Sequence, residues 1–231
     1  MQKFKTFKPL FVGRVKFKVM ALSLVLLCVV FGFTAESQSQ SIQAPIPEEP
    51  VIEPASEEGQ AAISQFKFPA NVECEMIAAE PDVANIVAFH RDYQGNIYVC
   101  ETFRQGKGVE DNRNHAHWMD EELAAQTVQD RIDYVRKYIP DADKTYTAKD
   151  DRIRLLKDTD GNGKPDSITV FSDRFNQLEM GTGAGVLSYR GKVYYTCIPD
   201  LFELQDADGD GVAEIRKSLH TGYGVRYAFR G

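Results

Sequence analysis

The chain has 231 residues, with 27 lysines and arginines against 34 aspartates and glutamates, and a formal net charge of -7. A composition of 43% hydrophobic and 26% charged residues is that of a globular protein and excludes disorder throughout the chain. The net acidity excludes a general nucleic-acid binder, which would need a basic face. These averages combine three parts of unlike composition.

Residues 1–37 have the composition of an export segment. Lysines and arginines but no acidic residues lie before residue 19, and the run from Val19 to Phe33 is almost entirely apolar. A basic region before a short apolar run is the pattern of a secretory signal peptide, and Ala35 and Ser37 supply small residues for cleavage. A spanning helix needs roughly 20 apolar residues, so a cleaved signal is favoured over a retained membrane anchor. We therefore expect an exported protein of the periplasm or cell envelope.

Residues 38–65 read as an acidic linker rich in proline, with no basic and no aromatic residue. Such a segment buries too little apolar surface to offset the entropy lost on ordering. We expect a disordered, extended tether, because its charges repel one another. The folded part, residues 66–231, is then expected to begin near Phe66.

An internal repeat organises the folded part. Ile153–Asp173 aligns with Leu201–Thr221 at an offset of 48 residues, and Gln94–Thr102 aligns with Arg190–Ile198 at an offset of 96. Because the two offsets differ by 48, the first repeat carries an insertion of about that length between its halves. The insertion is expected at roughly residues 105–150.

Each half of the repeat reads as a β-hairpin, two apolar runs joined at a turn that contains glycine. Two hairpins make four antiparallel strands in about 48 residues, which fits one blade of a β-propeller. The predicted class is all-β: a partial β-propeller of about two and a half blades. The alternative is a β-sandwich in which the repeat arose by chance.

The insertion is expected to hold one helix that packs on the propeller. Acidic residues from Asp120 to Glu122 suit a helix N-terminus, Arg136 and Lys137 suit a C-terminus, and Pro140 would end the helix. Its apolar stripe at helical spacing comprises Leu123, Val128, Ile132, Val135 and Ile139.

Two acidic loops carry the clearest chemical signal. Residues 158–166 and 206–214 both fit D-x-[DN]-x-[DN]-G-x-x-[DE], and such oxygen ligands suit calcium. The predicted ligands are Asp158, Asp160, Asn162, Lys164 and Asp166 in the first loop, and Asp206, Asp208, Asp210, Val212 and Glu214 in the second. Lys164 and Val212 would contribute backbone carbonyl oxygens.

These loops are not expected to be EF-hands. An EF-hand needs a bidentate Glu at position 12 and helices on both sides, whereas position 12 is Thr169 or Lys217 and the flanks resemble strands. The pattern is closer to the calcium hairpin loop of integrin-type propellers. A turn rich in Asp, Asn and Gly without a metal is the alternative.

Cysteine and histidine give weaker signals. Cys74, Cys100 and Cys197 remain after signal cleavage, an odd count that leaves at least one thiol outside any pair within the chain. Buried free thiols are favoured over a bridge between Cys100 and Cys197. His115 and His117 have the H-x-H spacing of metal ligands but no assignable third ligand, so helix docking is favoured.

Polar residues after a predicted strand end are further candidates for ligand contact. They are Glu101, Arg104, Asn112 and Arg113. The glycine-rich run Gly181–Gly185 lacks the spacing of a phosphate-binding loop and leads into a strand, so crowding on an innermost strand explains it better.

Four segments together resemble the N-terminal propeller of a family of membrane-bound dehydrogenases described mainly from planctomycetes, verrucomicrobia and Bacteroidetes. They are VECEMIAAEPDVANIVAFHRDYQGNIYVCE, WMDEELAAQTVQDRIDYVRKY, RIRLLKDTDGNGKPDSITVFSD and GVLSYRGKVYYTCIPDLFELQDADGDGVAEIRKSLHTGYGV. The resemblance spans roughly residues 66–231. That family is similar to glucose/sorbosone dehydrogenases, which are six-bladed propellers that use pyrroloquinoline quinone with calcium. The resemblance therefore implies a six-bladed parent for the partial propeller.

The resemblance implies oxidation of a sugar or alcohol, with electrons passed to a cytochrome partner or to a haem domain further along. The chain departs from the family pattern because it stops at Arg230-Gly231, inside the expected third blade, so it is expected to be a fragment. No catalytic or quinone-binding residue is carried over; only the acidic loops match in full. The alternative is a calcium-stabilised propeller that binds carbohydrate or protein without catalysis.

Overall fold

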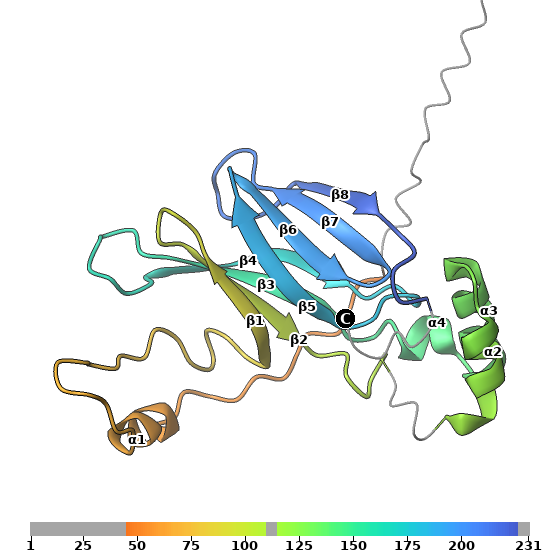
Figure 1. The fold of residues 1–231 in the computed structure, drawn as a ribbon, viewed down its shortest axis with the longest axis horizontal. Helices are drawn as coiled ribbons and strands as arrows, with labels where there is room; N and C mark the ends of the chain where they lie inside the picture. The colour runs from red at the N-terminus through yellow and green to blue at the C-terminus, as the bar shows by residue number, and fades with distance from the viewer. Residues whose placement is uncertain (1–44, 110–114, 226–231) are drawn as a thin grey trace, which may run out of the picture. The chain divides into compact units, whose positions relative to one another are not determined.

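The computed structural model describes residues 45–109 and 115–225, and within them eight strands form two antiparallel sheets (Figure 1). Within each sheet the strands lie side by side in chain order. The first sheet contains β1 (Ile86–Arg91), β2 (Ile97–Thr102), β3 (Asp151–Lys157) and β4 (Ser167–Phe175). The second contains β5 (Gly183–Tyr189), β6 (Lys192–Cys197), β7 (Asp200–Gln205) and β8 (Ile215–His220). The all-β class is confirmed, and the described residues hold no strand of a third sheet.

The sequence repeat is a repeat of strand pairing. Cys100 of β2 pairs with Ile153 of β3 in the first sheet, and Thr196 of β6 pairs with Leu201 of β7 in the second. The offsets between these pairs are 96 and 48 residues, the same as in the sequence alignment. Each predicted pair of hairpins therefore forms one four-stranded sheet.

The main core lies between the two sheets, because alternate side chains of a strand point to opposite faces. Its buried members include Tyr98, Cys100, Ile153, Leu155, Phe171 and Phe175 from the first sheet, and Val193, Tyr195, Cys197, Phe202 and Leu204 from the second. The opposite face of the first sheet carries a second cluster, in which Val83 packs with Val99 and Leu156.

The two sheets meet through faces that are not equivalent in the repeat. Tyr98 and Ile153 face the second sheet, but their counterparts, Tyr194 and Leu201, lie on strand positions that alternate with the core residues Tyr195 and Phe202. The face by which the first sheet contacts the second therefore corresponds to the outer face of the second. The packing is head-to-tail, whereas a two-fold sandwich would bring equivalent faces together.

The described residues between β2 and β3 form four helical elements where one helix was expected. They are the 3-10 turn η2 (Ala116–Trp118), α2 (Met119–Ala124), α3 (Val128–Tyr138) and α4 (Ala142–Thr145). The expectation of a single helix is wrong because Thr127 starts a new one. Its side chain accepts a hydrogen bond from the Asp130 backbone, and Asp130 reciprocates in a capping box. The last helical residue of α3, Tyr138, lies two residues before Pro140, as predicted.

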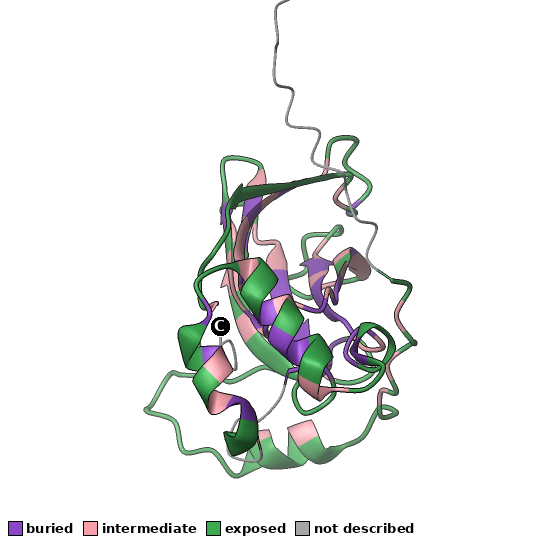
Figure 2. Cartoon of the chain, turned by 90° about the vertical axis from the view of Figure 1, so that its right-hand side faces the viewer, coloured by how far each residue is buried: buried purple, intermediate pink, exposed green. Residues whose placement is uncertain are grey.

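The helices pack through one face and lie at the end of the sheets away from the acidic loops (Figures 1 and 2). Val135 is buried and Ile132 and Ile139 are half-buried around it, but Leu123 is exposed and does not belong to the stripe. Leu178, on the β4–β5 connection, joins the same buried cluster. Arg131 donates to the Glu179 carbonyl at 3.0 Å, which fixes α3 to that connection.

The expected linker is partly structured. Residues 45–57 form no helix or strand, yet the Glu48 amide donates to the Ala148 carbonyl at 2.8 Å and Lys149 pairs with the Glu48 carboxylate at 2.8 Å. α1 (Glu58–Ser64) then forms where an extended tether was expected, although none of its residues is buried. Within the described ranges no helix is long and apolar enough to cross a membrane. The predicted export segment lies outside them.

Candidate metal centre

The first acidic loop, residues 158–166, joins β3 to β4. Asp158 accepts backbone hydrogen bonds from Gly161 and Gly163, both at 2.8 Å. Asp166 closes the loop by accepting from the Thr159 backbone and hydroxyl, both at 2.9 Å. These hydrogen bonds lower the pKa of the Asp166 carboxyl.

The second acidic loop, residues 206–214, joins β7 to β8 and repeats this arrangement. Asp206 accepts from Gly209 at 2.6 Å and from Gly211 at 2.9 Å, and Glu214 accepts from the Ala207 backbone at 2.7 Å. In both loops the carboxylate at position 1 therefore accepts hydrogen bonds from the backbone amides of positions 4 and 6. The carboxylate at position 9 accepts one from the amide of position 2. The two copies of the sequence motif therefore have the same backbone geometry, one copy on each sheet.

Glycine at position 6 is required by that geometry. Gly163 has a φ of 92° and Gly211 a φ of 91°. Residues with a side chain rarely adopt this left-handed region. The turn allows positions 1, 3, 5 and 9 to converge.

The second loop gathers four carboxylates. Oxygens of Asp206, Asp208, Asp210 and Glu214 all lie within 4.8 Å of one another, the one such group of acidic, histidine or cysteine side chains among the described residues. Oxygens that share a calcium ion at 2.3–2.6 Å lie at most about 5 Å apart. An all-oxygen, fourfold negative donor set suits a hard divalent cation, whose charge would offset the mutual repulsion. The residues therefore fit calcium.

The first loop is a weaker version of the same site. It has an amide at position 5, and the Asn162 nitrogen donates to Asp160 at 2.9 Å while its oxygen accepts from the Lys164 backbone at 2.8 Å. The loop thus has three carboxylates instead of four, and they do not converge on one centre as those of the second loop do. The Lys164 side chain pairs with Glu75 at 2.7 Å, so only its backbone carbonyl is left to act as a ligand.

The flanks of both loops are strands, as predicted. Position 12 falls at Thr169 in β4 and at Lys217 in β8, and neither residue offers a carboxylate. An EF-hand is therefore excluded, because both its bidentate glutamate and its helices are missing.

The two loops differ in what holds them. The Thr169 hydroxyl donates to the Gly211 carbonyl at 2.6 Å, and the Ala213 amide donates to the Phe171 carbonyl at 2.7 Å. The second loop is thus hydrogen-bonded to the first sheet, and Gly211 is buried whereas Gly163 is exposed. Sequence analysis missed Thr169 as a support for the second loop, because no local pattern relates residues 42 positions apart.

Glu101, one of the polar candidates for ligand contact, is fully buried in an ion-pair network. Its carboxylate contacts Arg152 at 2.5 Å and Arg154 at 3.4 Å, and accepts from the Ala84 backbone at 2.6 Å. This glutamate ties the segment before β1 to β2 and β3. We assign it a structural role.

Arg104 is likewise fully buried and binds backbone carbonyls. It donates to Met180 at 2.8 Å and Gln177 at 3.0 Å, and more weakly to Tyr146 at 3.3 Å. The side chain joins the loop after β2, the end of the helical segment and the β4–β5 connection. Asn112 and Arg113, the other two candidates of this group, lie outside the described residues.

The H-x-H pair belongs to the helical cluster. His115 stacks on Trp118 with ring centroids 4.3 Å apart, and His117 lies edge-on to Tyr138 at 5.3 Å. Trp118 itself is buried. This supports helix docking, and no third metal ligand gathers beside these rings within the described residues.

The glycine-rich run and the core cysteines also have packing roles. A Cβ atom added at Gly183 would lie 1.6 Å from the Tyr195 hydroxyl, so β5 can pass β6 only with glycine there. Cys100 and Cys197 are buried free thiols in the core, and Cys74 is an exposed free thiol. The described cysteines thus form no disulfide.

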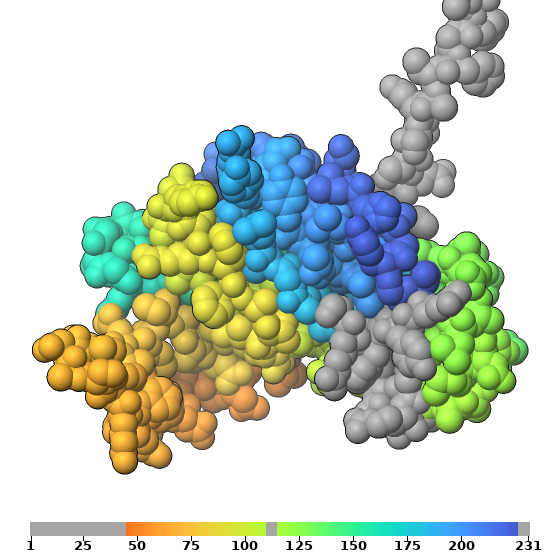
Figure 3. Space-filling view, viewed as in Figure 1, coloured from red at the N-terminus to blue at the C-terminus, as the bar shows by residue number. Residues whose placement is uncertain are grey.

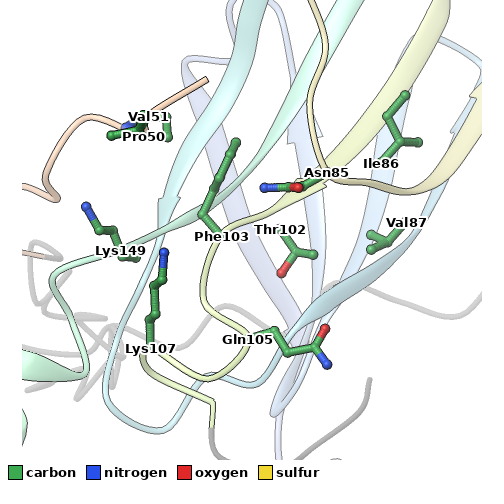
Figure 4. Close-up of a pocket in the computed structure, with 10 residues that line it drawn as sticks. All are labelled: Pro50, Val51, Asn85, Ile86, Val87, Thr102, Phe103, Gln105, Lys107 and Lys149. Atoms are coloured by element: carbon green, nitrogen blue, oxygen red, sulfur yellow. The ribbon is translucent and has the colours of Figure 1, made fainter. Parts of the chain in front are cut away.

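A cavity of about 460 Å³, lined by both polar and apolar side chains, opens beside the C-terminal end of β2 (Figure 4). The ring of Phe103 lies among Asn85, Thr102, Lys107 and Lys149 in this view. The Phe103 ring also contacts the Arg152 guanidinium, 5.1 Å from its centroid. The cavity offers an aromatic surface with amide, hydroxyl and ammonium groups around it.

Comparison with known proteins identifies a family whose description assigns no activity. The family described as "Domain of unknown function (DUF7133)" matches residues 58–228. No curated protein and no solved structure matches the chain.

Proposed function

Because the chain belongs to the DUF7133 family, whose description assigns no activity, we propose a function from the geometry. We infer that the chain is a calcium-binding β-propeller segment of an exported protein, with each four-stranded sheet serving as one blade. The observation that carries this proposal is the pair of acidic loops with the same hydrogen-bond pattern at the same position of two repeated sheets.

Head-to-tail packing supports the propeller reading over a sandwich. In a propeller each blade covers one face of the next, so non-equivalent faces meet and the contact can be repeated around a ring. The contact between Tyr98 of the first sheet and the side of the second sheet that bears Tyr195 is of this kind. Four antiparallel strands in chain order are also the composition of a blade.

The resemblance to quinoprotein dehydrogenases supports a role in sugar or alcohol oxidation, which stays a prediction. Pyrroloquinoline quinone would supply the two-electron chemistry, and a cytochrome or haem domain would accept the electrons. Glu101 and Arg104, the described polar candidates, are committed to ion pairs and carbonyls. We therefore assign no catalytic residue to this chain.

The alternative is carbohydrate or protein binding without catalysis. The cavity beside Phe103 favours it, because an aromatic ring surrounded by amide and ammonium donors matches the apolar and hydroxyl faces of a sugar. Lys107 and Asn85 would then donate to or accept from sugar hydroxyls.

Calcium titration of the mature chain tests the main proposal. We expect calorimetric binding and a rise in melting temperature on adding calcium after chelation, because binding to the native state alone stabilises it. Magnesium at the same concentration serves as a control, since it demands a near-ideal octahedral shell and gives up its water ligands reluctantly. Identical melting temperatures with calcium and with chelator would refute calcium binding.

Cofactor and ligand assays separate the two remaining readings. The chain is mixed with pyrroloquinoline quinone and calcium and assayed with an artificial electron acceptor on a panel of aldoses and alcohols. Quinone-dependent acceptor reduction supports oxidation. Sugar binding without acceptor reduction, lost in Phe103→Ala, supports the binding reading.

A further inference from the structure

The cavity beside Phe103 is positively charged, although the chain as a whole has a net charge of -7. Lys107 and Lys149 both line it, and none of its described lining residues is acidic. In the close-up the two ammonium groups lie on the same side of the Phe103 ring (Figure 4). Two like charges that are concentrated in a cavity attract a ligand of the opposite sign.

Lys107 provides an ammonium group that forms no ion pair with any described residue. It lies in a tight turn after β2, where its backbone amide donates to the Arg104 carbonyl at 2.8 Å and the Val109 amide donates to the same oxygen at 3.0 Å. Gly108 in this turn is buried, and a Cβ atom added there would lie 2.5 Å from the Tyr146 carbonyl. The backbone that carries Lys107 is therefore held in place before any ligand binds.

The contact made by Lys149 indicates which anion suits this cavity. Its ammonium pairs with the Glu48 carboxylate at 2.8 Å, and this hydrogen bond is the main reason that the pKa of the Glu48 carboxyl is lowered. Glu48 belongs to the segment that contributes Pro50 and Val51 to the cavity wall. In the space-filling view this orange segment lies against the yellow surface of β1 and β2 (Figure 3). One of the two ammonium groups thus already binds a carboxylate from within the chain.

The uncharged polar groups of the cavity suit the hydroxyl groups of a sugar. The Thr102 hydroxyl donates to the Asp151 carboxylate at 2.8 Å, so its oxygen is left to accept a hydrogen bond from a ligand. Asn85 and Gln105 are exposed amides that line the same cavity. Because an amide both donates and accepts, these three side chains can bond to hydroxyl groups in either direction.

The apolar lining and the size of the cavity also suit a sugar ring. Phe103 is half-buried, and Ile86 and Val87 add apolar surface beside it. A volume of about 460 Å³ falls within the range of roughly 300–1,000 Å³ that is usual for small-molecule sites. No arginine is among the described lining residues, although arginine is the side chain that best matches a phosphate group. A carboxylate on a sugar therefore fits the lining better than a phosphate.

We propose that this cavity binds an acidic sugar, a uronic acid whose carboxylate pairs with Lys107 while its ring packs on Phe103. The hydroxyl groups of the sugar then bond to the amide and hydroxyl side chains around the ring. The inference rests on the sugar-binding alternative of the proposed function and assigns the class of sugar. It needs neither calcium nor a quinone.

Calorimetric titration with a matched pair of sugars tests the proposal. The full chain in calcium-free buffer is titrated with methyl β-glucuronide and with methyl β-glucoside, which differ only in whether the exocyclic carbon is a carboxylate or a hydroxymethyl group. We expect the glucuronide to bind at least about tenfold more tightly, because a charge-assisted hydrogen bond is about twice as strong as a neutral one. Calcium is left out so that it cannot bridge the sugar to an acidic loop.

Three variants assign the binding to the cavity. Lys107→Gln should lower the affinity for the glucuronide to that for the glucoside and leave the glucoside unaffected, because glutamine keeps a donor but loses the charge. Lys217→Gln in β8 removes the same charge outside the cavity and should leave both affinities as in the parent chain. Phe103→Ala should weaken the binding of both sugars.

The outcomes separate this inference from the function on which it rests. Equal affinities for the two sugars, both lost in Phe103→Ala, overturn the inference and leave the sugar-binding alternative standing. Binding of neither sugar overturns both. Acetate that binds as tightly as the glucuronide overturns the inference, because charge alone would then suffice. Displacement of the glucuronide by one equivalent of pyrroloquinoline quinone also overturns it, because the cavity would then belong to the quinone.

Discussion

The two sheets share one strand pattern and differ in what surrounds it. Glu101 of the first sheet sits in a buried network with Arg152 and Arg154, whereas its repeat counterpart, Cys197, is an apolar core residue. The first sheet also carries the helical segment and a cover over its outer face, and among the described residues the second sheet has neither. The repeat therefore fixes the strand pairing, whereas equivalent buried positions of the two copies carry different side chains with different partners.

The two acidic loops show the same division. Their internal hydrogen bonds correspond, but only the second loop is bonded to the neighbouring sheet, through Thr169 and Phe171. Its fourth carboxylate, Asp210, replaces the amide of Asn162. We therefore expect the second loop to bind a cation more tightly and to link its occupancy to the packing of the sheets.

The largest expected difference in the free energy of unfolding is between the variants Glu101→Ala and Cys197→Ala. Glu101→Ala leaves Arg152 buried without its partner and should lower the free energy of unfolding by about 3–5 kcal/mol. Cys197→Ala leaves only a small cavity and should cost about 1–2 kcal/mol. Urea unfolding of both variants measures the difference, and equal losses would contradict the contrast between the sheets.

Calcium should stabilise the chain chiefly through the second loop. At a concentration 100 times the dissociation constant, one site adds about 2.7 kcal/mol of stability. Asp206→Ala should remove more of the calcium-induced rise in melting temperature than Asp158→Ala, its counterpart in the first loop. Asp133→Asn in α3 is the control and should keep the full rise. A larger loss from Asp158→Ala would reverse the ranking of the loops.

The two cysteines buried in the core between the sheets should make the free energy of unfolding fall at alkaline pH. Burial raises the pKa of Cys100 to about 12, with the Asp151 carboxylate adding to the rise, and burial likewise raises that of Cys197. Unfolded thiols titrate near 8.5, so the contribution is complete below about pH 8.5 and is lost as pH rises toward 12. Each thiol should lower the free energy of unfolding by up to about 1.4 kcal/mol per pH unit in that window.

Unfolding of Cys100→Ala between pH 8 and pH 10 checks this slope. The variant should lose less stability over the interval than the parent chain, because one titrating thiol is removed. Cys74→Ala is the control, since that thiol is exposed and should leave the slope unchanged. Parallel pH curves for Cys100→Ala and the parent would contradict the assignment.

The smallest expected effect is that of Thr169→Val. It removes the hydroxyl that donates to Gly211 and should cost about 1 kcal/mol. It should also weaken calcium binding at the second loop and leave the first unaffected, because only the second touches this residue. Calorimetry on Thr169→Val in an Asp158→Ala background isolates the second site. Unchanged affinity there would show that the loop does not depend on its attachment.

Local sequence rules predicted much of the fold. Gly163 and Gly211 marked the turns, alternation marked strands, and Pro140 marked the end of a helix, because these signals act within a few neighbouring residues. The single expected helix failed at Thr127, where a capping box outweighed the continuing apolar stripe. The sequence could name Glu101 and Arg104 only as candidates for ligand contact, because a polar residue after a strand has the same local pattern whether it faces solvent or a buried partner.

The sequence by itself determined the repeat, the pairs of hairpins and the positions of two acidic loops, because each depends on spacing along the chain. Only the tertiary structure decided which faces meet, that Glu101 and Arg104 are structural, and that the second loop is held by Thr169. These features depend on contacts between residues tens of positions apart. Such contacts follow from how the two sheets pack, which no local pattern encodes.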